Sequence, residues 1–128
     1  MTTQFTAKQI EGKGRGKFLG FPTINLEIPK GFELADGVYA AWVTIDETRF
    51  RGALHWGPIP TFEETGKSLE VYVLGVGDHE LSHADLSRVT VEPVARLRNI
   101  EKFASIDALT RQIELDVIAV RKNLRDNF

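Results

Sequence analysis

The sequence contains no cysteine among its 128 residues, and this absence removes three kinds of chemistry. A disulfide framework, a thiolate metal site and a cysteine nucleophile are all excluded. Such cross-links are not required, because a domain of this length typically buries about two thirds of the surface that its unfolded chain exposes. We therefore expect one domain, residues 1–128, built around a single apolar core.

An excess of charge of one sign is also missing, since 16 Lys and Arg residues face 18 Asp and Glu residues and leave a net charge of −2. A general nucleic-acid binder shows a broad basic surface, so we expect no nucleic-acid partner. No apolar run reaches membrane-spanning length, and the first residues lack the pattern of a signal peptide. We expect a soluble, cytoplasmic monomer without a membrane partner.

What the sequence does contain is a series of short runs rich in β-branched and aromatic residues, separated by Gly, Pro and Asp. These runs lie around 4–11, around 22–28, and at 38–45, 51–56, 69–75 and 87–97. Their spacing favours a small barrel or sandwich. In the run 69–75, alternation places Leu69 and Val71 on one face and Glu70 and Tyr72 on the other.

The pattern changes after Ser105, where apolar residues recur every three or four positions from Ile106 to Leu124. This period is typical of an amphipathic helix, with Ser105 as its expected N-cap and Asp116 among its polar positions. We expect the helix to pack against the β-structure; a partner-binding helix is the alternative. The polar connection at 28–37 is long enough to serve as a lid.

The most unusual stretch is GKGRGKFLGFPTIN, residues 12–25. Its glycine spacing matches neither the P-loop nor the dinucleotide-binding fingerprint. Glycines at 12, 14 and 16 nevertheless let backbone N–H groups approach an anion, and the interleaved cations add positive charge. An anion-binding loop and a plain glycine-rich hairpin both remain open.

The end of this stretch, Pro-Thr-Ile-Asn, suggests a metal site. In an extended chain Thr23 and Asn25 lie on the same face and present two neutral oxygens. Mg²⁺ prefers oxygen ligands, keeps several waters and usually completes its coordination with substrate phosphates. A sparse site beside an anion-binding loop is therefore chemically sensible, and a strand-edge Thr followed by a turn Asn is the alternative.

Residues 12–25, read as Gly-x-Gly-Arg-Gly-x-x-Leu-Gly-Phe-Pro-Thr-x-Asn, closely resemble the signature of the riboflavin kinase (flavokinase) family. Further stretches resemble that family in register across nearly the whole chain. They are DGVYA (36–40), GPIPTF (57–62), Leu69-Glu70-Val71, Leu97-Arg98, Lys102-Phe103, and the helix positions Leu109, Ile113 and Asp116.

This resemblance implies a mainly β fold, a six-stranded antiparallel Greek-key β-barrel with a C-terminal amphipathic α-helix. It also implies a riboflavin kinase, which transfers the γ-phosphoryl group of ATP to the 5′-hydroxyl of riboflavin with Mg²⁺ and yields FMN and ADP. Two mobile segments, here about 28–37 and 96–103, are expected to close over the flavin. The implied site residues are Gly12, Lys13, Gly14, Arg15, Gly16, Lys17, Pro22 and Thr23 for ATP, Thr23 and Asn25 for Mg²⁺, Glu70 as the base, and Arg98 and Phe103 for the flavin.

The sequence departs from the family pattern in three places. His55 stands where the family usually has Asn, and we interpret it as a packing or nucleotide-side substitution. The family's Asp-Leu-Tyr-Gly turn ends here in Ser82 and His83, and the acidic residues after Leu-Arg become Asn99 and Ile100. These changes motivate an alternative function, a catalytically weakened flavin- or nucleotide-binding module.

Two further expectations concern the ends of the resemblance. Because the chain starts close to the kinase signature, we expect no FMN adenylyltransferase domain. For Arg98, a surface ion pair is the alternative to a contact with flavin or phosphate.

Overall fold

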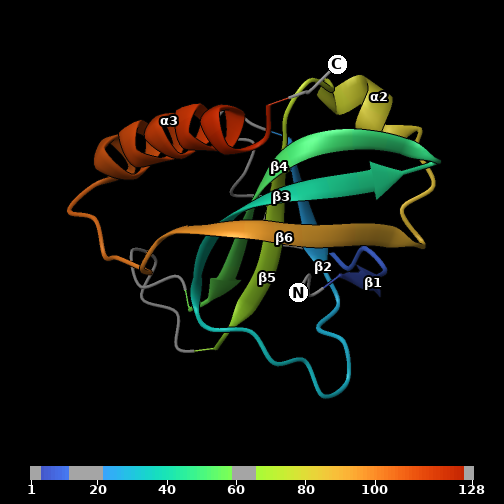
Figure 1. The fold of residues 1–128 in the computed structure, drawn as a ribbon, viewed down its shortest axis with the longest axis horizontal. Helices are drawn as coiled ribbons and strands as arrows, with labels where there is room; N and C mark the ends of the chain where they lie inside the picture. The colour runs from blue at the N-terminus through green and yellow to red at the C-terminus, as the bar shows by residue number, and fades with distance from the viewer. Residues whose placement is uncertain (1–3, 12–21, 59–65, 126–128) are drawn as a thin grey trace.

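Six strands and two helices form the part of the chain that the structure, a computed structural model, describes: residues 4–11, 22–58 and 66–125 (Figure 1). The strands are β1 (Phe5–Ala7), β2 (Thr23–Leu26), β3 (Gly37–Ile45), β4 (Thr48–Gly57), β5 (Ser68–Val73) and β6 (Val89–Arg98). The helices are α2 (Asp78–Ser82) and α3 (Ile106–Asn123).

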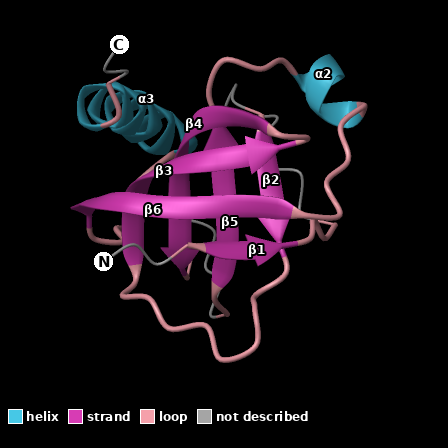
Figure 2. Ribbon diagram, turned by 45° about the vertical axis from the view of Figure 1, so that its right-hand side comes forward, coloured by secondary structure: helices cyan, strands magenta, loops and turns pink. Residues whose placement is uncertain are grey.

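All strand pairs are antiparallel, in the order β1-β6-β3-β4-β5-β2. Strands β3, β4 and β5 follow one another, and β6 returns to pair with β3, which is the Greek-key arrangement. The sheet curls so that its edges approach each other at a bridge between Gln9 and Leu26, as the curvature in Figure 2 shows. The predicted six-stranded antiparallel fold with a C-terminal helix is confirmed, as a curled half-barrel.

The hairpin between β3 and β4 is tighter than the sequence indicates. Its two turn residues, Asp46 and Glu47, both have positive φ, 49° and 67°. Two-residue hairpin turns with this backbone match the right-handed twist of the strands, but they usually contain Gly or Asn. Without that signal, the strand predicted at 51–56 is too short, and β4 begins at Thr48 directly after the turn.

The two faces of the sheet carry different residues. On β5, Leu69, Val71 and Val73 are at most 2% exposed and point into the curled interior. Ile24, Leu26, Leu54, Val89 and Val91 join them in the same apolar core. The predicted alternation along 69–75 is thus confirmed, and Glu70 and Tyr72 lie on the outer face.

Helix α3 packs on that outer face (Figure 2). The Ser105 hydroxyl accepts a hydrogen bond of 3.1 Å from the Ala108 N–H, as expected of an N-cap. The apolar cluster beneath the helix contains Val117, Val120 and Leu124 together with Ala40, Ala53 and Leu74. Packing against the β-structure is therefore confirmed, and no helix within the described ranges is long and apolar enough to cross a membrane.

Two positions on α3 differ from the predicted pattern. Ile106, expected on the packed face, is 44% exposed: it is the first residue of the helix, and the buried positions begin only at Leu109. Asp116, expected at a polar position, is only 5% exposed, because Arg98 neutralises it from the sheet side.

Helix α2 occupies the segment that the sequence marks as a turn. The Glu80 carboxylate accepts a hydrogen bond of 3.4 Å from the Gly77 N–H and so closes the first turn of the helix. At the other end, the Ser82 hydroxyl donates to the His79 carbonyl at 2.7 Å. The rings of His79 and His83 meet edge to face with centroids 4.5 Å apart, so the altered residues build a helical turn rather than a plain loop.

The connection at 28–37 has neither helix nor strand before β3 but is anchored to the core. The Phe32 ring meets both Phe5 and Trp56 edge to face, each with a centroid separation of 4.9 Å. The Trp56 indole N–H donates to the Leu34 carbonyl at 2.8 Å. This conformation is held from the core side, and the movement of the segment as a lid stays a prediction.

Candidate functional site

Strand β2 presents its polar side chains outward. Ile24 and Leu26 are at most 1% exposed and point into the core. Since side chains alternate along a strand, Thr23 and Asn25 both lie on the outer face, and both are partly exposed. The structure thus agrees with the shared face predicted for these two oxygens.

The register of β2 against β5 brings this pair next to the predicted base. Asn25 is directly opposite Glu70, and Thr23 is directly opposite Tyr72. Opposed residues of an antiparallel pair have Cβ atoms roughly 4.5–5.5 Å apart. Glu70 is 8% exposed, so most of this residue is shielded from water at its position opposite Asn25.

The same register continues across the sheet to β6. Glu70 pairs with His55 on β4, His55 pairs with Val38 on β3, and Val38 pairs with Arg98 on β6. We call Asn25, Glu70, His55, Val38 and Arg98 the cross-strand row. The row joins residues that are far apart in the sequence, from the predicted metal ligand to a predicted flavin residue.

His55 is the member of the row whose position the sequence did not place near the base. Its Nδ1 atom is buried and has no hydrogen-bond partner within the described part of the chain. Burial, and then the positive charge of Arg98, lower the pKa of His55 from 6.5 to about 4, although the backbone carbonyls of Pro58 and Ser68 act in the opposite direction. His55 is therefore a neutral imidazole beside Glu70 at physiological pH.

Arg98 ends the row in a partly buried ion pair with α3. Its Nε and Nη2 atoms each donate to one oxygen of Asp116 at 2.9 Å. The guanidinium carbon is 5.6 Å from the centre of the Phe103 ring. The two predicted flavin residues are thus brought together, and the ion pair considered as an alternative for Arg98 is present and partly buried.

Phe103 also belongs to an apolar wall beside the row. The wall consists of Phe103 and Tyr72 packed against Leu109 and Ile113 of α3. Tyr72 lies on the same face of β5 as Glu70, two residues along the strand. A flat aromatic substrate could therefore lie against this wall with its polar end toward Glu70.

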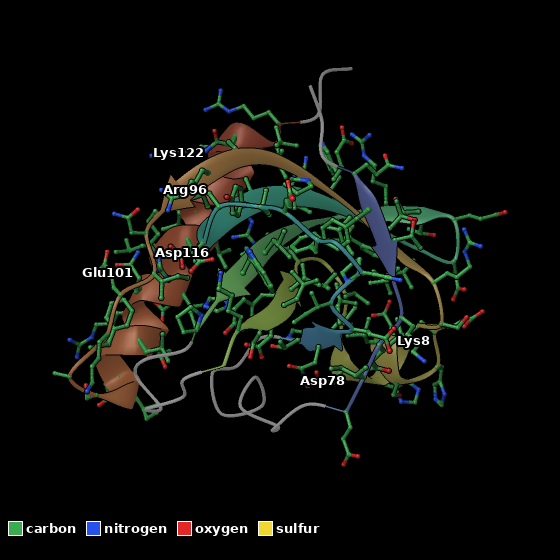
Figure 3. All side chains as sticks on the ribbon, turned by 90° about the horizontal axis from the view of Figure 1, so that it is seen from below. Lys8, Asp78, Arg96, Glu101, Asp116 and Lys122 are labelled. Carbon is green, nitrogen blue, oxygen red and sulfur yellow. The ribbon has the colours of Figure 1, made fainter. Side chains whose placement is uncertain are left out.

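A cavity of about 370 Å³ opens at the Asn25 end of the row. It is lined by residues 10 and 11, by residues 25–28 and by residues 67–69. A larger hollow, of about 820 Å³, lies between β1 and α2 and includes Lys8 and Asp78, at the end of the molecule away from Asp116 (Figure 3). Asn25 is the member of the cross-strand row that lines the smaller cavity, and no member of the row lines the larger one.

Residues 12–17, predicted to hold the ATP phosphates, lie outside the described residues. The flanks of this segment are placed: the Ile10 N–H donates to the Asn25 carbonyl at 2.8 Å, and the Val73 N–H donates to the Pro22 carbonyl at 3.0 Å. Both flanks are therefore attached at the Asn25 end of the row. The assignment of the glycines and cations to phosphate stays a prediction.

The donor set at this end fits a divalent ion of the Mg²⁺ type. No cluster of three or more His, Cys, Asp or Glu side chains occurs within the described ranges, so a closed site made of such ligands is not built there. Thr23 and Asn25 supply two hard neutral oxygens on one face beside a carboxylate. Mg²⁺ commonly binds through few protein ligands and takes the rest from water and phosphate.

Comparison with known proteins identifies the family. The family described as "Flavokinase: Riboflavin kinase" matches residues 1–124. The RNA-binding riboflavin kinase of Bacillus subtilis is 29% identical over 116 residues, which cover 88% of this chain and 47% of that protein. The bifunctional riboflavin kinase/FMN adenylyltransferase of Escherichia coli strain K12 is 31% identical over 120 residues, 91% of this chain and 36% of that protein.

The fold has a counterpart among solved structures. Riboflavin kinase from Trypanosoma brucei superposes with a TM-score of 0.60 over 93% of this chain and 77% of that chain, at 20% identity. This likeness supports the fold alone, and the chain spans less than half the length of the two bacterial relatives. Because the family match extends over almost the whole sequence, the chain belongs to the riboflavin kinase family.

Proposed function

We propose that this chain is a riboflavin kinase, which transfers the γ-phosphoryl group of ATP to the 5′-hydroxyl of riboflavin and produces FMN and ADP. The observation that carries the proposal is the direct pairing of Asn25 with Glu70 in a member of this family. Phosphoryl transfer depends on alignment, charge neutralisation and a group that accepts the proton of the attacking hydroxyl. The outer face of β2 and β5 offers residues for each of these tasks.

Glu70 is the general base in this proposal. As the bond between the 5′ oxygen and the γ-phosphorus forms, the bond from that phosphorus to the oxygen of ADP breaks, and the hydroxyl proton passes to the Glu70 carboxylate. A primary alcohol is too weak an acid to ionise unaided near neutral pH, and a positioned base is typically worth about 10² to 10⁴ in rate. Glu70 as a residue is only 8% exposed, which would limit the access of competing water.

Thr23 and Asn25 would hold the divalent ion, which when bound neutralises charge on the phosphate oxygens. Gly12, Lys13, Gly14, Arg15, Gly16 and Lys17 would cover the phosphates, with Pro22 and Thr23 at the end of that loop. The apolar wall of Tyr72 and Phe103 would receive the flavin ring, with Arg98 at its polar edge. ATP, riboflavin and Mg²⁺ are therefore the ligands we propose.

We also propose that the protein is a cytoplasmic monomer that does not bind nucleic acid. One relative is named an RNA-binding riboflavin kinase, but the net charge of −2 in this chain argues against a general nucleic-acid binder. A mobility-shift titration with single- and double-stranded RNA at low salt is expected to show no complex. A salt-sensitive complex at micromolar protein would contradict this expectation.

The alternative is a flavin- or nucleotide-binding module of the same fold with weakened catalysis. It is favoured by His83 in place of a turn glycine, which closes helix α2, and by Asn99 and Ile100 after Arg98. One assay separates the two functions: the protein is incubated with riboflavin, ATP and Mg²⁺, and FMN is measured by chromatography. Turnover supports the kinase, whereas riboflavin binding without FMN formation supports the binding module.

A further inference from the structure

Asp116 is a buried carboxylate on a helix face that is otherwise apolar. It lies on α3 between Ile113 and Val117, both at most 4% exposed, and it faces the sheet (Figure 3). Together with Glu70, it makes up the charged side chains that are buried within the described ranges. A buried ion pair is often no more stabilising than apolar residues of similar volume, so stability alone does not account for a carboxylate here.

The contacts of Asp116 fix a single orientation of Arg98. Each carboxylate oxygen accepts one hydrogen bond of 2.9 Å from the guanidinium, and Oδ1 also accepts one of 3.1 Å from the Gln112 amide. The Arg98 side chain is 15% exposed and the Asp116 side chain 6%. A two-point contact of this kind holds the planar guanidinium more rigidly than a single hydrogen bond.

The held guanidinium still has unused donors. A guanidinium carries five N–H groups. Two of them bind Asp116, and Nη1 donates a third to the Asn99 carbonyl at 3.1 Å. Two N–H groups, one on each terminal nitrogen, are therefore left without a partner among the described residues.

These donors lie next to both parts of the candidate site. Arg98 belongs to the cross-strand row, and its positive charge helps to lower the pKa of His55, the neighbour of Glu70. The guanidinium also lies near the Phe103 ring of the apolar wall. An acceptor oxygen on a molecule packed against that wall is therefore within the reach of Arg98.

We propose that Asp116 is a positioning residue, which orients Arg98 so that its two terminal N–H groups bind an oxygen of the flavin substrate or product. The proposal rests on the proposed function. The acceptor is either a carbonyl of the flavin ring or the phosphate of FMN. The two sources differ in one measurable way, because riboflavin has the ring carbonyls but not the phosphate.

The first test is Asp116→Asn, which keeps the size of the side chain and removes the charge that holds Arg98. A lost hydrogen bond to a charged group corresponds to roughly a tenfold change in affinity or more. We expect the Kd for riboflavin, followed by flavin fluorescence, and the KM for riboflavin to rise about tenfold, with less than a twofold change in the KM for ATP. If the acceptor is the phosphate, the Kd for FMN rises and that for riboflavin does not.

Glu114→Gln is the matched control, since it neutralises an exposed carboxylate on the same helix and is expected to change none of these constants. Arg98→Lys is the second variant, because lysine keeps the charge but cannot form the two-point contact. If Asp116 acts through Arg98, the variant with both substitutions has a flavin Kd no higher than that of the single variant that binds flavin more weakly. If Asp116→Asn does not fold, Arg98→Lys still tests the proposal. This variant must weaken flavin binding by itself, and an unchanged Kd for both riboflavin and FMN would overturn the proposal.

The outcomes separate this proposal from the proposed function. An Asp116→Asn protein with a lower Tm but wild-type Kd values for riboflavin and FMN would overturn the positioning role and leave the kinase intact. A wild-type protein that binds flavin but forms no FMN would reject the kinase, while the binding arm still decides the role of Asp116. A wild-type protein that binds neither riboflavin nor FMN would overturn both.

Discussion

The two faces of the curled sheet are built from the same strands but carry different chemistry. On β5, Leu69 and Val71 point inward and are at most 2% exposed, while Glu70 between them points outward to Asn25 and His55. The inner face consists of interchangeable apolar side chains that hold the curvature. The outer face packs against α3 through Ala40, Ala53 and Leu74, but it also carries specific polar residues whose neighbours are set by the strand register. A one-residue shift of β5 would turn Glu70 inward and Leu69 outward.

The strongest test of this difference is Glu70→Gln, which removes the proposed base and preserves its size. We expect kcat to fall by about 10² to 10⁴ with little change in the Kd for riboflavin or in Tm. Steady-state kinetics and a thermal melt measure both effects, with Glu114→Gln as the control carboxylate. A kcat within threefold of wild type would remove Glu70 from the role of base.

The neighbouring inner residue is expected to behave in the opposite way. Leu69→Ala leaves a cavity in the core and is expected to lower the free energy of unfolding by about 2–5 kcal/mol. The fraction that stays folded should keep a kcat near that of the wild type. Urea denaturation gives the first quantity and kinetics at low temperature the second; a stable variant with a large loss of kcat would show that the faces are not separate.

His55 allows a test of the outer face that depends on pH. Its pKa is 6.5 in the unfolded chain and about 4 in the fold, so the unfolded chain binds the proton first as the pH falls. Protonation of His55 therefore leaves the free energy of unfolding unchanged above about pH 7. Between about pH 6.5 and 4 it lowers that free energy by about 1.4 kcal/mol per pH unit, or about 3 kcal/mol in all. His55→Asn removes this dependence, which urea denaturation at several pH values would reveal as a widening advantage of the variant in acid. Parallel curves for the two proteins would contradict it.

The smallest expected effect concerns the predicted metal ligand. Asn25→Ala removes one oxygen donor and leaves Thr23, water and phosphate to hold the ion. We expect the Mg²⁺ concentration for half-maximal activity to rise at least about tenfold, with a smaller change in kcat at saturating Mg²⁺. An unchanged Mg²⁺ titration of FMN formation would count against Asn25 as a ligand.

Local patterns in the sequence predict much of this architecture because they depend on near neighbours along the chain. The period of α3 and its Ser105 cap, and the alternation that turns Glu70 away from the core, follow from single segments. The β3–β4 turn is missed because Asp46 and Glu47 adopt positive φ without a glycine.

The site is less accessible to such reasoning because it depends on register between strands that are distant in the sequence. Nothing local places His55 beside Glu70. Asp116 looks like a solvent-facing residue until Arg98 is found opposite it, because a buried charge needs a partner that the helix period does not reveal. Resemblance to the family named Glu70 and Asn25 as site residues, whereas it gave His55 only as a packing or nucleotide-side substitution and Asp116 only as a position on the terminal helix.

The central claim is that Asn25 and Glu70 act in one site, and a double-mutant cycle on kcat/KM for riboflavin tests it most directly. Asn25→Ala, Glu70→Gln and the double variant are compared at fixed ATP and Mg²⁺. If both residues act on the same transferring group, the double variant is about as slow as the slower single variant. If the two losses multiply in full, Asn25 and Glu70 act independently and the account of a shared site is wrong.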